Sequence, residues 1–269
     1  MGVLLHRAQP DIAGQLPAID NREMFRTSEF ELWARNTGLI EEEKFLLPRY
    51  LRPDASTLEA GTAGGRILHE LAALGFQSLR GFDNVPELIA EARLRDRTGR
   101  ITFDVEDAVK LSYADDMFDQ IIYLQQILCC IADEQARLSA MREARRVLRP
   151  GGVALVSFLG WEVRSRDPRY VPFIVWLRVL RACSGSRIPI QALPWFRRGA
   201  SFNWGVLKDA GPYVHWYRVE EAYRQLTDCG FVVQGMGSGR QLREGRLLTS
   251  INEFARAPRS GMYYFVCTK

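Results

Sequence analysis

Residues 58–66 read LEAGTAGGR, and this stretch decides the fold class. Glu59 ends a short apolar run, five small residues follow, and a helical pattern begins at Ile67. Small residues let a ligand approach the backbone, and a helix N-terminus supplies unpaired N–H groups and a partial positive charge. The stretch therefore predicts a strand, a loop and a helix, with a nucleotide-type site at the carboxyl end of the first strand of an open α/β sheet.

Two other glycine-rich motifs do not fit this loop. The dinucleotide fingerprint G-x-G-x-x-G fails because Ala63 stands two residues after Gly61. A phosphate-binding loop of the Walker type fails because no Lys-Ser or Lys-Thr pair follows the glycines. The loop alone is therefore a weak signal.

Further strand ends follow in order along the chain. Gly81–Asn84 closes a second apolar segment, and an acid at position 83 suits the paired hydroxyls of a ribose. Asp104–Ala108 comes next, and residues 118–123 form a fourth apolar strand pattern. Finally, a helical pattern ends at Leu148–Gly152 and leads into a fifth strand, Val153–Phe158.

This ordered set resembles the class I S-adenosylmethionine-dependent methyltransferases, of the type 11-like kind, over about residues 45–160. The first motif of that family, acid-x-Gly-x-Gly-x-Gly, corresponds to Glu59, Gly61, Ala63 and Gly65, with alanine in place of the middle glycine. The methyl group of Ala63 would then lie near the methionine part of the cofactor. The Leu-Arg-Pro-Gly-Gly turn of the family corresponds to Leu148–Gly152.

The resemblance implies S-adenosyl-L-methionine as cofactor, with S-adenosylhomocysteine as product. It implies that Asp83 binds the ribose hydroxyls and that Asp107 and Ala108 contact the adenine. Glu59 would orient the loop and hold the methionine amino group, while Leu124 and Gln125 would lie under the sulfonium. The full set of expected cofactor-binding residues is Glu59, Gly61, Thr62, Ala63, Gly65, Asp83, Asn84, Asp107, Ala108, Leu124 and Gln125.

The implied fold is a Rossmann-like, doubly wound seven-stranded α/β sheet whose last strand is antiparallel, with a helical lid inserted after the fifth strand. The chain then divides into an N-terminal helical extension at residues 1–55, a cofactor-binding α/β core at 56–160, a substrate lid at 161–218 and the rest of the core at 219–269. Its 269 residues are ample for one such α/β core with extensions.

The expected lid is rich in aromatic and basic residues. It holds five of the six tryptophans and ten Arg or Lys against three acids. Aromatic rings and guanidinium groups suit an aromatic or anionic acceptor, so we expect substrate contacts from Trp161, Trp176, Trp195, Trp204 and Arg197. The alternative is that the tryptophans pack the lid onto the core and the arginines are solvated.

Within the lid, residues 171–183 have the pattern of an amphipathic helix. Phe173, Trp176, Leu177 and Leu180 recur at helical spacing, while Arg178 and Arg181 lie on another face. Such a helix covers a core or a substrate channel more often than it lies on a membrane interface, and two basic residues are few for the latter.

Catalytic candidates are scarce. Of three histidines, His215 at the exit of the lid is the best general base, and Tyr217 lies two residues further on. The alternative is that His215 has a structural role where the lid rejoins the core. No His, Cys, Asp or Glu cluster has ligand spacing, so we expect no metal.

Composition is that of an ordinary soluble globular protein, with 47% hydrophobic residues and a net charge of +4. This charge does not indicate a dominant nucleic-acid or membrane field. There is no signal-peptide or membrane-spanning pattern, so we expect no stable membrane insertion. The five cysteines show no Cys-x-x-Cys spacing, which favours reduced thiols in the cytoplasm.

Three functions are compatible with these features. The favoured one is O-, N- or C-methylation of a small-molecule acceptor in biosynthesis. A second is a tRNA- or RNA-modifying methyltransferase, because residues 212–217 are loosely similar to wobble-uridine methyltransferases and Arg240, Arg243 and Arg246 add basic charge. The low whole-chain charge makes nucleic acid the less favoured partner. The third is a non-catalytic methyltransferase-like subunit. The oligomeric state stays open.

Overall fold

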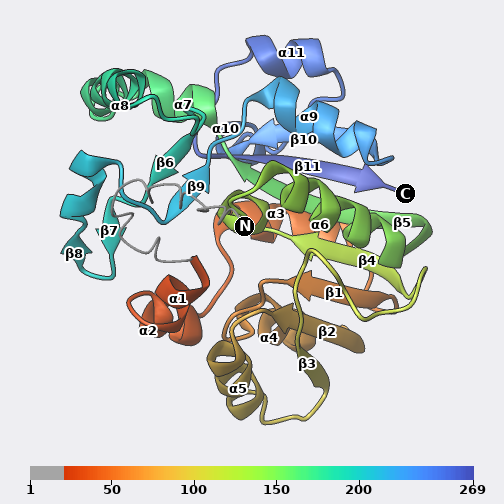
Figure 1. Cartoon of the computed structure of the whole chain (residues 1–269). Helices are drawn as coiled ribbons and strands as arrows, with labels where there is room; N and C mark the ends of the chain where they lie inside the picture. The colour runs from red at the N-terminus through yellow and green to blue at the C-terminus, as the bar shows by residue number, and fades with distance from the viewer. Residues whose placement is uncertain (1–20) are drawn as a thin grey trace, which may run out of the picture.

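A seven-stranded mixed sheet forms the centre of the protein, whose computed structural model describes residues 21–269 (Figure 1). The strand order is β10-β11-β5-β4-β1-β2-β3. Strands β1 to β5 run parallel to one another, and β11 is antiparallel to both of its neighbours, β5 and β10. The strands are β1 Ser56–Ala60, β2 Ser78–Asp83, β3 Ile101–Val105, β4 Phe118–Tyr123, β5 Leu148–Leu159, β10 Val232–Ser238 and β11 Met262–Thr268. The predicted doubly wound fold with an antiparallel last strand is confirmed.

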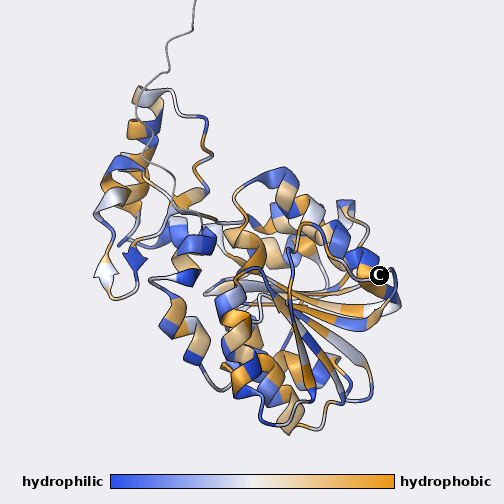
Figure 2. Ribbon diagram, turned by 60° about the horizontal axis from the view of Figure 1, so that its bottom comes forward, coloured by the Kyte–Doolittle hydropathy of each residue, from blue (hydrophilic) through white to orange (hydrophobic). Residues whose placement is uncertain are grey.

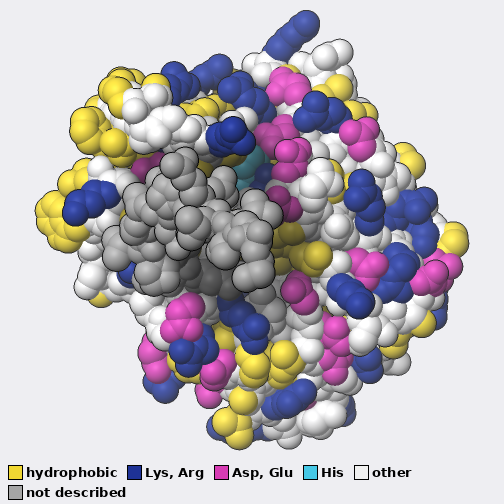
Figure 3. Space-filling view, in the orientation of Figure 1, with side chains coloured by type: hydrophobic (Ala, Val, Ile, Leu, Met, Phe, Trp, Pro, Cys, Tyr) yellow, Lys and Arg dark blue, Asp and Glu magenta, His cyan; other side chains and the backbone are white. Residues whose placement is uncertain are grey.

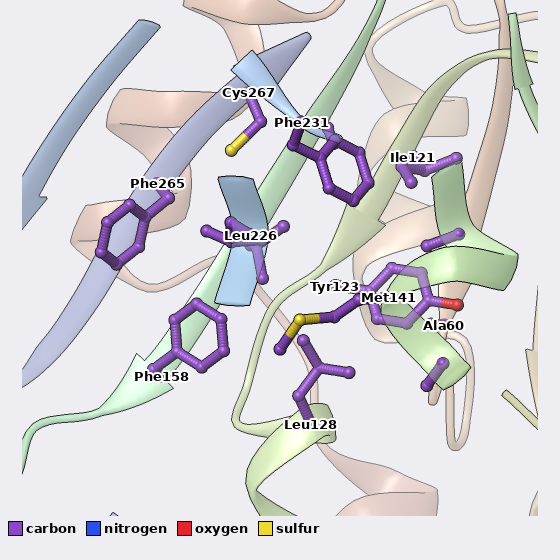
Figure 4. Close-up of a cluster of buried hydrophobic side chains, with 14 of the residues drawn as sticks. Ala60, Ile121, Tyr123, Leu128, Met141, Phe158, Leu226, Phe231, Phe265 and Cys267 are labelled. Carbon is purple, nitrogen blue, oxygen red and sulfur yellow. The ribbon is translucent and has the colours of Figure 1, made fainter. Parts of the chain in front are cut away.

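Helices cover both faces of the sheet. One core cluster packs α6 Glu134–Val147, α9 Val219–Asp228 and α11 Ile251–Arg256 against one face. Figure 4 shows Met141 and Leu226 of this cluster beside Tyr123, Phe158 and Phe265 of the strands. The other cluster packs α3 Glu41–Tyr50, α4 Arg66–Ala73, α5 Pro86–Arg95 and α10 Gly239–Arg243 against the opposite face. Because parallel strands are buried on both faces, they read as nearly continuous apolar runs, which made them easy to predict.

The fifth strand differs from its prediction at one end. The expected turn at Leu148–Gly152 lies inside β5, which starts at Leu148. The pairing with β4 shifts register between Phe118 and Gln120, and Gly151 has φ +76°. The glycines therefore form a bulge within the strand rather than a turn before it.

Residues 161–218 connect β5 to α9. They contain α7 Trp161–Arg166, α8 Val171–Ser184, β6 Ala192–Pro194, β7 Arg197–Arg198, β8 Ser201–Phe202, the short helix η2 Trp204–Lys208 and β9 Tyr213–His215. β6 pairs with β9, and β7 with β8, so the segment has its own two small sheets. Figure 1 and Figure 2 show it standing to one side of the α/β body.

Three further short helices lie near the ends of the strands. At the N-terminal side, α1 Asn21–Arg26 and α2 Phe30–Arg35 lie next to the segment 161–218 in Figure 1. The helix η1 Ile127–Cys130 follows β4. The first twenty residues of the predicted N-terminal extension lie outside the described residues. Across residues 21–269, no helix combines the length and the apolar character needed to cross a membrane.

Candidate functional site

The loop after β1 has an unusual backbone. Gly61, Ala63 and Gly65 all have positive φ, at +58°, +47° and +78°. A Cβ on Gly61 would lie 2.2 Å from Cδ1 of Ile127, and one on Gly65 would lie 2.8 Å from the ring of Phe103. Glycine is therefore required at both positions by conformation and by close packing. The loop leads directly into α4, whose N-cap Gly65 offers no side chain to bond the first N–H groups of the helix.

Two buried carboxylates flank this loop. Glu59 accepts a hydrogen bond from the hydroxyl of Thr62 at 2.6 Å, through Oε2. Asp83, at the end of β2, accepts from the backbone N–H of Ala63 at 3.1 Å and from that of Val85 at 3.0 Å. These bonds fix the two carboxylates relative to each other and to the loop.

Burial raises the pKa of both groups. Burial lifts the pKa of Glu59 to about 8, against the opposing effects of the Thr62 hydroxyl and the charge of Arg66. Burial likewise lifts the pKa of Asp83 to about 6, although backbone N–H groups partly stabilise its ionised form. Each carboxylate therefore gains from a ligand that donates a proton or carries positive charge.

The residues after β3 form a more open part of the site. Oδ1 of Asp107 accepts from the N–H of Val109 at 3.0 Å, which makes a tight turn. The side chain of Asp107 is exposed, and Ala108 is half-buried. Glu106 lies beside them and accepts hydrogen bonds from the backbone and hydroxyl of Ser112.

A buried polar network supports the residues after β4. Gln125 and Gln126 both have left-handed backbone, with φ of +60° and +66°. Nε2 of Gln125 donates to Glu43 of α3 at 2.7 Å, and Glu43 forms a two-point ion pair with Arg66 at 2.6 Å for each bond. The network therefore joins α3, α4 and the β4 loop. Glu43 and Arg66 were not predicted as site residues.

All these segments open onto one cavity of about 410 Å³ at the carboxyl ends of the parallel strands. Its lining includes every predicted cofactor residue except Gly65, the N-cap residue of α4. The lining consists of Asn21, Arg22, Phe25, Trp33, Asn36, Glu59, Gly61, Thr62, Ala63, Arg66, Ile67, Phe82, Asp83, Asn84, Leu88, Glu106, Asp107, Ala108, Val109, Leu124, Gln125, Gln126, Ile127, Cys130, Ile131, Ala132, Pro212 and Tyr213.

Comparison with known proteins finds a methyltransferase domain and a shared fold. A family described as a methyltransferase domain matches residues 57–152. A crystal structure of an S-adenosylmethionine-dependent methyltransferase from Methanosarcina mazei has the same fold, with a TM-score of 0.57 and 21% identity over 82% of this chain and 95% of that one. Residues 57–152 therefore match a methyltransferase domain, and the chain has the fold of S-adenosylmethionine-dependent methyltransferases.

Relatives in sequence agree with this family. A methyltransferase-like protein from Encephalitozoon cuniculi is 26% identical over 192 residues, or 71% of this chain and 77% of that protein. Methyltransferase GfsG from Streptomyces halstedii is 34% identical over 111 residues, which is 38% of each chain. The latter similarity therefore covers well under half of either chain.

The hydrogen-bond acceptors that line the cavity of the methyltransferase fit S-adenosylmethionine. Oε1 of the buried Glu59 accepts no hydrogen bond from residues 21–269, so it is available to a donor such as an ammonium group. The two oxygens of Asp83 accept the backbone N–H groups of Ala63 and Val85, and an ionised carboxylate can accept further bonds from hydroxyl donors. The methyl group of Ala63 belongs to an apolar cluster with Ala34 and Leu88. Its packing there offsets part of the strain of its positive φ.

The predicted substrate residues of the methyltransferase lie outside the cavity lining. Trp161 is buried in a cluster with Ile174 and Leu177 of α8. By contrast, Trp176, Trp204 and Arg197 are exposed. Trp195 is adjacent to the site, because its Nε1 donates to Oδ1 of Asn21 at 3.0 Å. None of the five is among the lining residues.

The predicted catalytic residues are also absent from the lining. His215 is buried, with its Nε2 2.7 Å from Oε1 of Glu221 at the start of α9. Tyr217 is fully buried against Phe158 and His215, and burial raises the pKa of its hydroxyl well above its usual value. These contacts anchor β9 to α9, and the roles of His215 and Tyr217 in catalysis stay predictions.

Sequence reasoning missed the N-terminal part of the site. Asn21, Arg22 and Phe25 of α1, Trp33 of α2, and Asn36 directly after α2 line the cavity. Nδ2 of Asn21 donates to the carbonyl of Cys130 at 2.6 Å and to that of Tyr213 at 2.9 Å. One side chain therefore joins α1, η1 and β9 over the cavity. An aromatic cluster in a short helical pattern was the available signal, but it did not indicate which surface the rings would face.

Proposed function

We propose that this methyltransferase transfers a methyl group to a small, largely apolar acceptor held in the cavity between α1–α2, η1 and β9. The observation that carries the proposal is the chemistry of the lining away from the glycine loop. Phe25 and Trp33 come from the N-terminal helices, Ile131 from the segment after η1, and Pro212 and Tyr213 from β9 and the residue before it. Enclosed apolar sites with few polar groups suit small molecules.

The cofactor-binding roles proposed for this chain follow the geometry. Glu59 would hold the methionine amino group, and Asp83 would accept both ribose hydroxyls. Asp107 would accept from the adenine amine, since one of its oxygens is free of the Val109 turn. Gln125, held by Glu43, would maintain the loop beneath the sulfonium.

When bound, the cofactor supplies an activated methyl group, and the protein supplies position and exclusion of water. Asn21 would keep the roof closed through its bonds to Cys130 and Tyr213. Nε1 of Trp33 is a buried donor with no partner in the described part of the chain, so we propose that it bonds an oxygen of the acceptor. Residues 161–218 would act as the lid by contributing Pro212 and Tyr213 to the cavity lining. The tryptophans of this segment would not contact the acceptor.

An RNA acceptor has less support. The lining contains four acids, Glu59, Asp83, Glu106 and Asp107, against two arginines. The predicted basic side is largely neutralised, because Arg240 and Arg246 pair with Glu244. Arg243 similarly pairs with Glu42. A groove that follows a phosphate backbone requires uncompensated positive charge, which neither the cavity lining nor these three arginines provide.

The test combines cofactor titration with a transfer assay. S-adenosylhomocysteine should bind the purified chain, and NAD should not. Label from methyl-labelled cofactor should then appear in members of a panel of small aromatic and apolar alcohols, phenols and amines, and not in tRNA. Trp33→Phe should raise the acceptor KM about tenfold, the loss of one hydrogen bond to a buried group, with cofactor affinity unchanged. Transfer to tRNA alone would overturn the proposal.

The predicted base has its own experiment. His215→Gln keeps a hydrogen-bonding side chain next to Glu221 and removes the titratable imidazole. If His215 takes the acceptor proton, His215→Gln should lower kcat by at least about a hundredfold while cofactor affinity is retained. An unchanged kcat would assign His215 to support of β9 only.

A further inference from the structure

The helix α8 is apolar on two opposite faces. Ile174 and Leu177 pack inward with Arg181, which is buried. On the other side, Val175 and Trp176 are exposed, Trp176 by 48% of its surface, and Val171 and Val179 continue the same stripe. A helix that is apolar all round is normally buried on all sides. The sequence pattern placed Trp176 and Leu177 on one face and both arginines on the other, and that interpretation was wrong.

The exposed stripe continues onto a neighbouring segment. Nε1 of Trp176 donates to the carbonyl of Leu207 in η2 at 3.3 Å, so α8 and η2 are in contact. Phe202 and Trp204 stack edge to face at 5.0 Å, and Trp204 is 73% exposed. We define these residues as the aromatic patch: Val171, Val175, Trp176, Val179, Phe202, Trp204 and Leu207. Figure 3 shows hydrophobic side chains gathered over α8 and β8 at the left edge of the molecule.

A buried ion pair holds the two parts of the patch together. Arg181 makes a two-point contact with Asp209, with both N···O distances 2.7 Å. It also donates to the carbonyls of Pro189 and Ala192. Because Asp209 directly follows η2, this arginine ties α8 to the segment that carries Trp204. The aromatic patch is therefore a preformed surface and not a loose loop.

The charge around the aromatic patch is positive. Arg178, Arg197 and Lys208 are exposed on the same segments, and none of them forms a salt bridge within residues 21–269. The three acids of residues 161–218 are all engaged elsewhere. Asp209 pairs with Arg181, Asp167 with Arg169, and Glu162 accepts from the hydroxyl of Tyr263.

We propose that the aromatic patch docks reversibly on the interface of a bilayer that contains anionic lipids. Indole and phenyl rings partition to the headgroup region, and exposed cations beside them are attracted to anionic headgroups. A bilayer fits better than a protein partner, because its charge is complementary and its surface does not require matched shape. No residue of the patch lines the cavity, so docking is a property separate from methyl transfer. It involves no membrane-spanning segment.

The experiment is flotation of the full-length chain with vesicles of phosphatidylcholine, alone or mixed with phosphatidylglycerol. We expect binding to the mixed vesicles, weak binding to the neutral ones, and a loss of binding as salt increases. Arg178→Gln should weaken the partition about fivefold, the effect of one cation near such a surface. Trp176→Ser combined with Trp204→Ser should weaken it at least tenfold, by the transfer of two rings from the interface.

Leu94→Ser is the matched control, because Leu94 is 78% exposed on α5, away from the patch. It should bind vesicles as the parent does. Affinity for S-adenosylhomocysteine and the circular dichroism spectrum show that each variant is folded. A parent chain that ignores anionic vesicles, or a double-tryptophan variant that binds as well as the parent, would overturn the proposal.

Two other occupants of the patch give distinct results. A dimer by light scattering that Trp204→Ser dissociates, together with no vesicle binding, would assign the patch to contact between copies. A variant that begins at residue 21 and binds vesicles when the full chain does not would assign the patch to residues 1–20. Either result would overturn lipid docking by the intact protein.

Discussion

The ion pair between Glu43 and Arg66 leads to the sharpest prediction about stability. The carboxylate of Glu43 is fully buried, and it accepts four hydrogen bonds. Two come from Arg66 at 2.6 Å, one from Gln125 at 2.7 Å and one from the N–H of Ile40 at 3.0 Å. Glu43→Ala removes all four acceptor contacts and leaves a buried guanidinium without its main counter-charge.

The expected loss follows from what Arg66 retains. Breaking a buried pair by removing one partner costs about 3–5 kcal/mol. Arg66 keeps a hydrogen bond to the carbonyl of Gly38, so we expect a loss at the lower end of this range, about 3 kcal/mol in the free energy of unfolding. In a chain of 269 residues this corresponds to a fall in Tm of about 6–12 °C. Affinity for S-adenosylhomocysteine should fall as well, because Gln125 loses its anchor.

Urea unfolding followed by circular dichroism measures the loss. Glu41→Ala is the matched control, since Glu41 lies on the same helix and pairs with Lys44 at the surface. That change should cost less than about 0.5 kcal/mol. Glu43→Ala combined with Arg66→Met removes both charges and should recover part of the loss. The reasoning fails if Glu43→Ala is no more damaging than Glu41→Ala, or if the double variant loses the sum of the two single changes.

Three other predictions concern the cavity. Burial raises the pKa of Asp83 to about 6, and ribose hydroxyls favour its ionised form, so affinity for S-adenosylhomocysteine should fall up to about tenfold per pH unit below 6. Calorimetric titration across this pH range measures the fall. Asp83→Asn should weaken binding and make the affinity nearly independent of pH. Ala63→Gly should raise the free energy of unfolding by up to about 1 kcal/mol, since φ is +47° there, and a loss of stability would show that methyl packing outweighs strain. Asn21→Ala should cost about 1–3 kcal/mol, because it leaves the Trp195 N–H without its acceptor and frees α1 from β9. An unchanged Tm together with an unchanged acceptor KM would show that Asn21 does not close the cavity.

The cavity lining around the glycine loop was predictable because its signals are local or repeat at strand ends. Glu59, Gly61 and Gly65 lie in one continuous strand–loop–helix stretch. Asp83 and Asp107 follow the ends of later strands, and parallel strands bring their carboxyl ends to one edge of the sheet. The sequence order of these residues therefore implies their proximity, and the cavity contains both acids.

The lid was less predictable because its composition does not indicate which side chains point into the protein and which point to solvent. A tryptophan in a helical pattern reads as buried, yet Trp176 and Trp204 are exposed. An arginine reads as solvated, yet Arg181 is buried beside Asp209, which lies 28 residues away. No local pattern distinguishes a paired arginine from a free one.

The amino-acid sequence by itself determined the class of fold, the cofactor and the residues of the glycine loop, because these depend on short-range motifs and on strand order. Only the tertiary structure decided which other side chains complete the site. Glu43 reaches Gln125 across 82 residues, and Asn21 reaches Tyr213 across 192. Such pairs have no periodicity along the chain, so their interaction exists only once the sheet, the N-terminal helices and the lid have packed together.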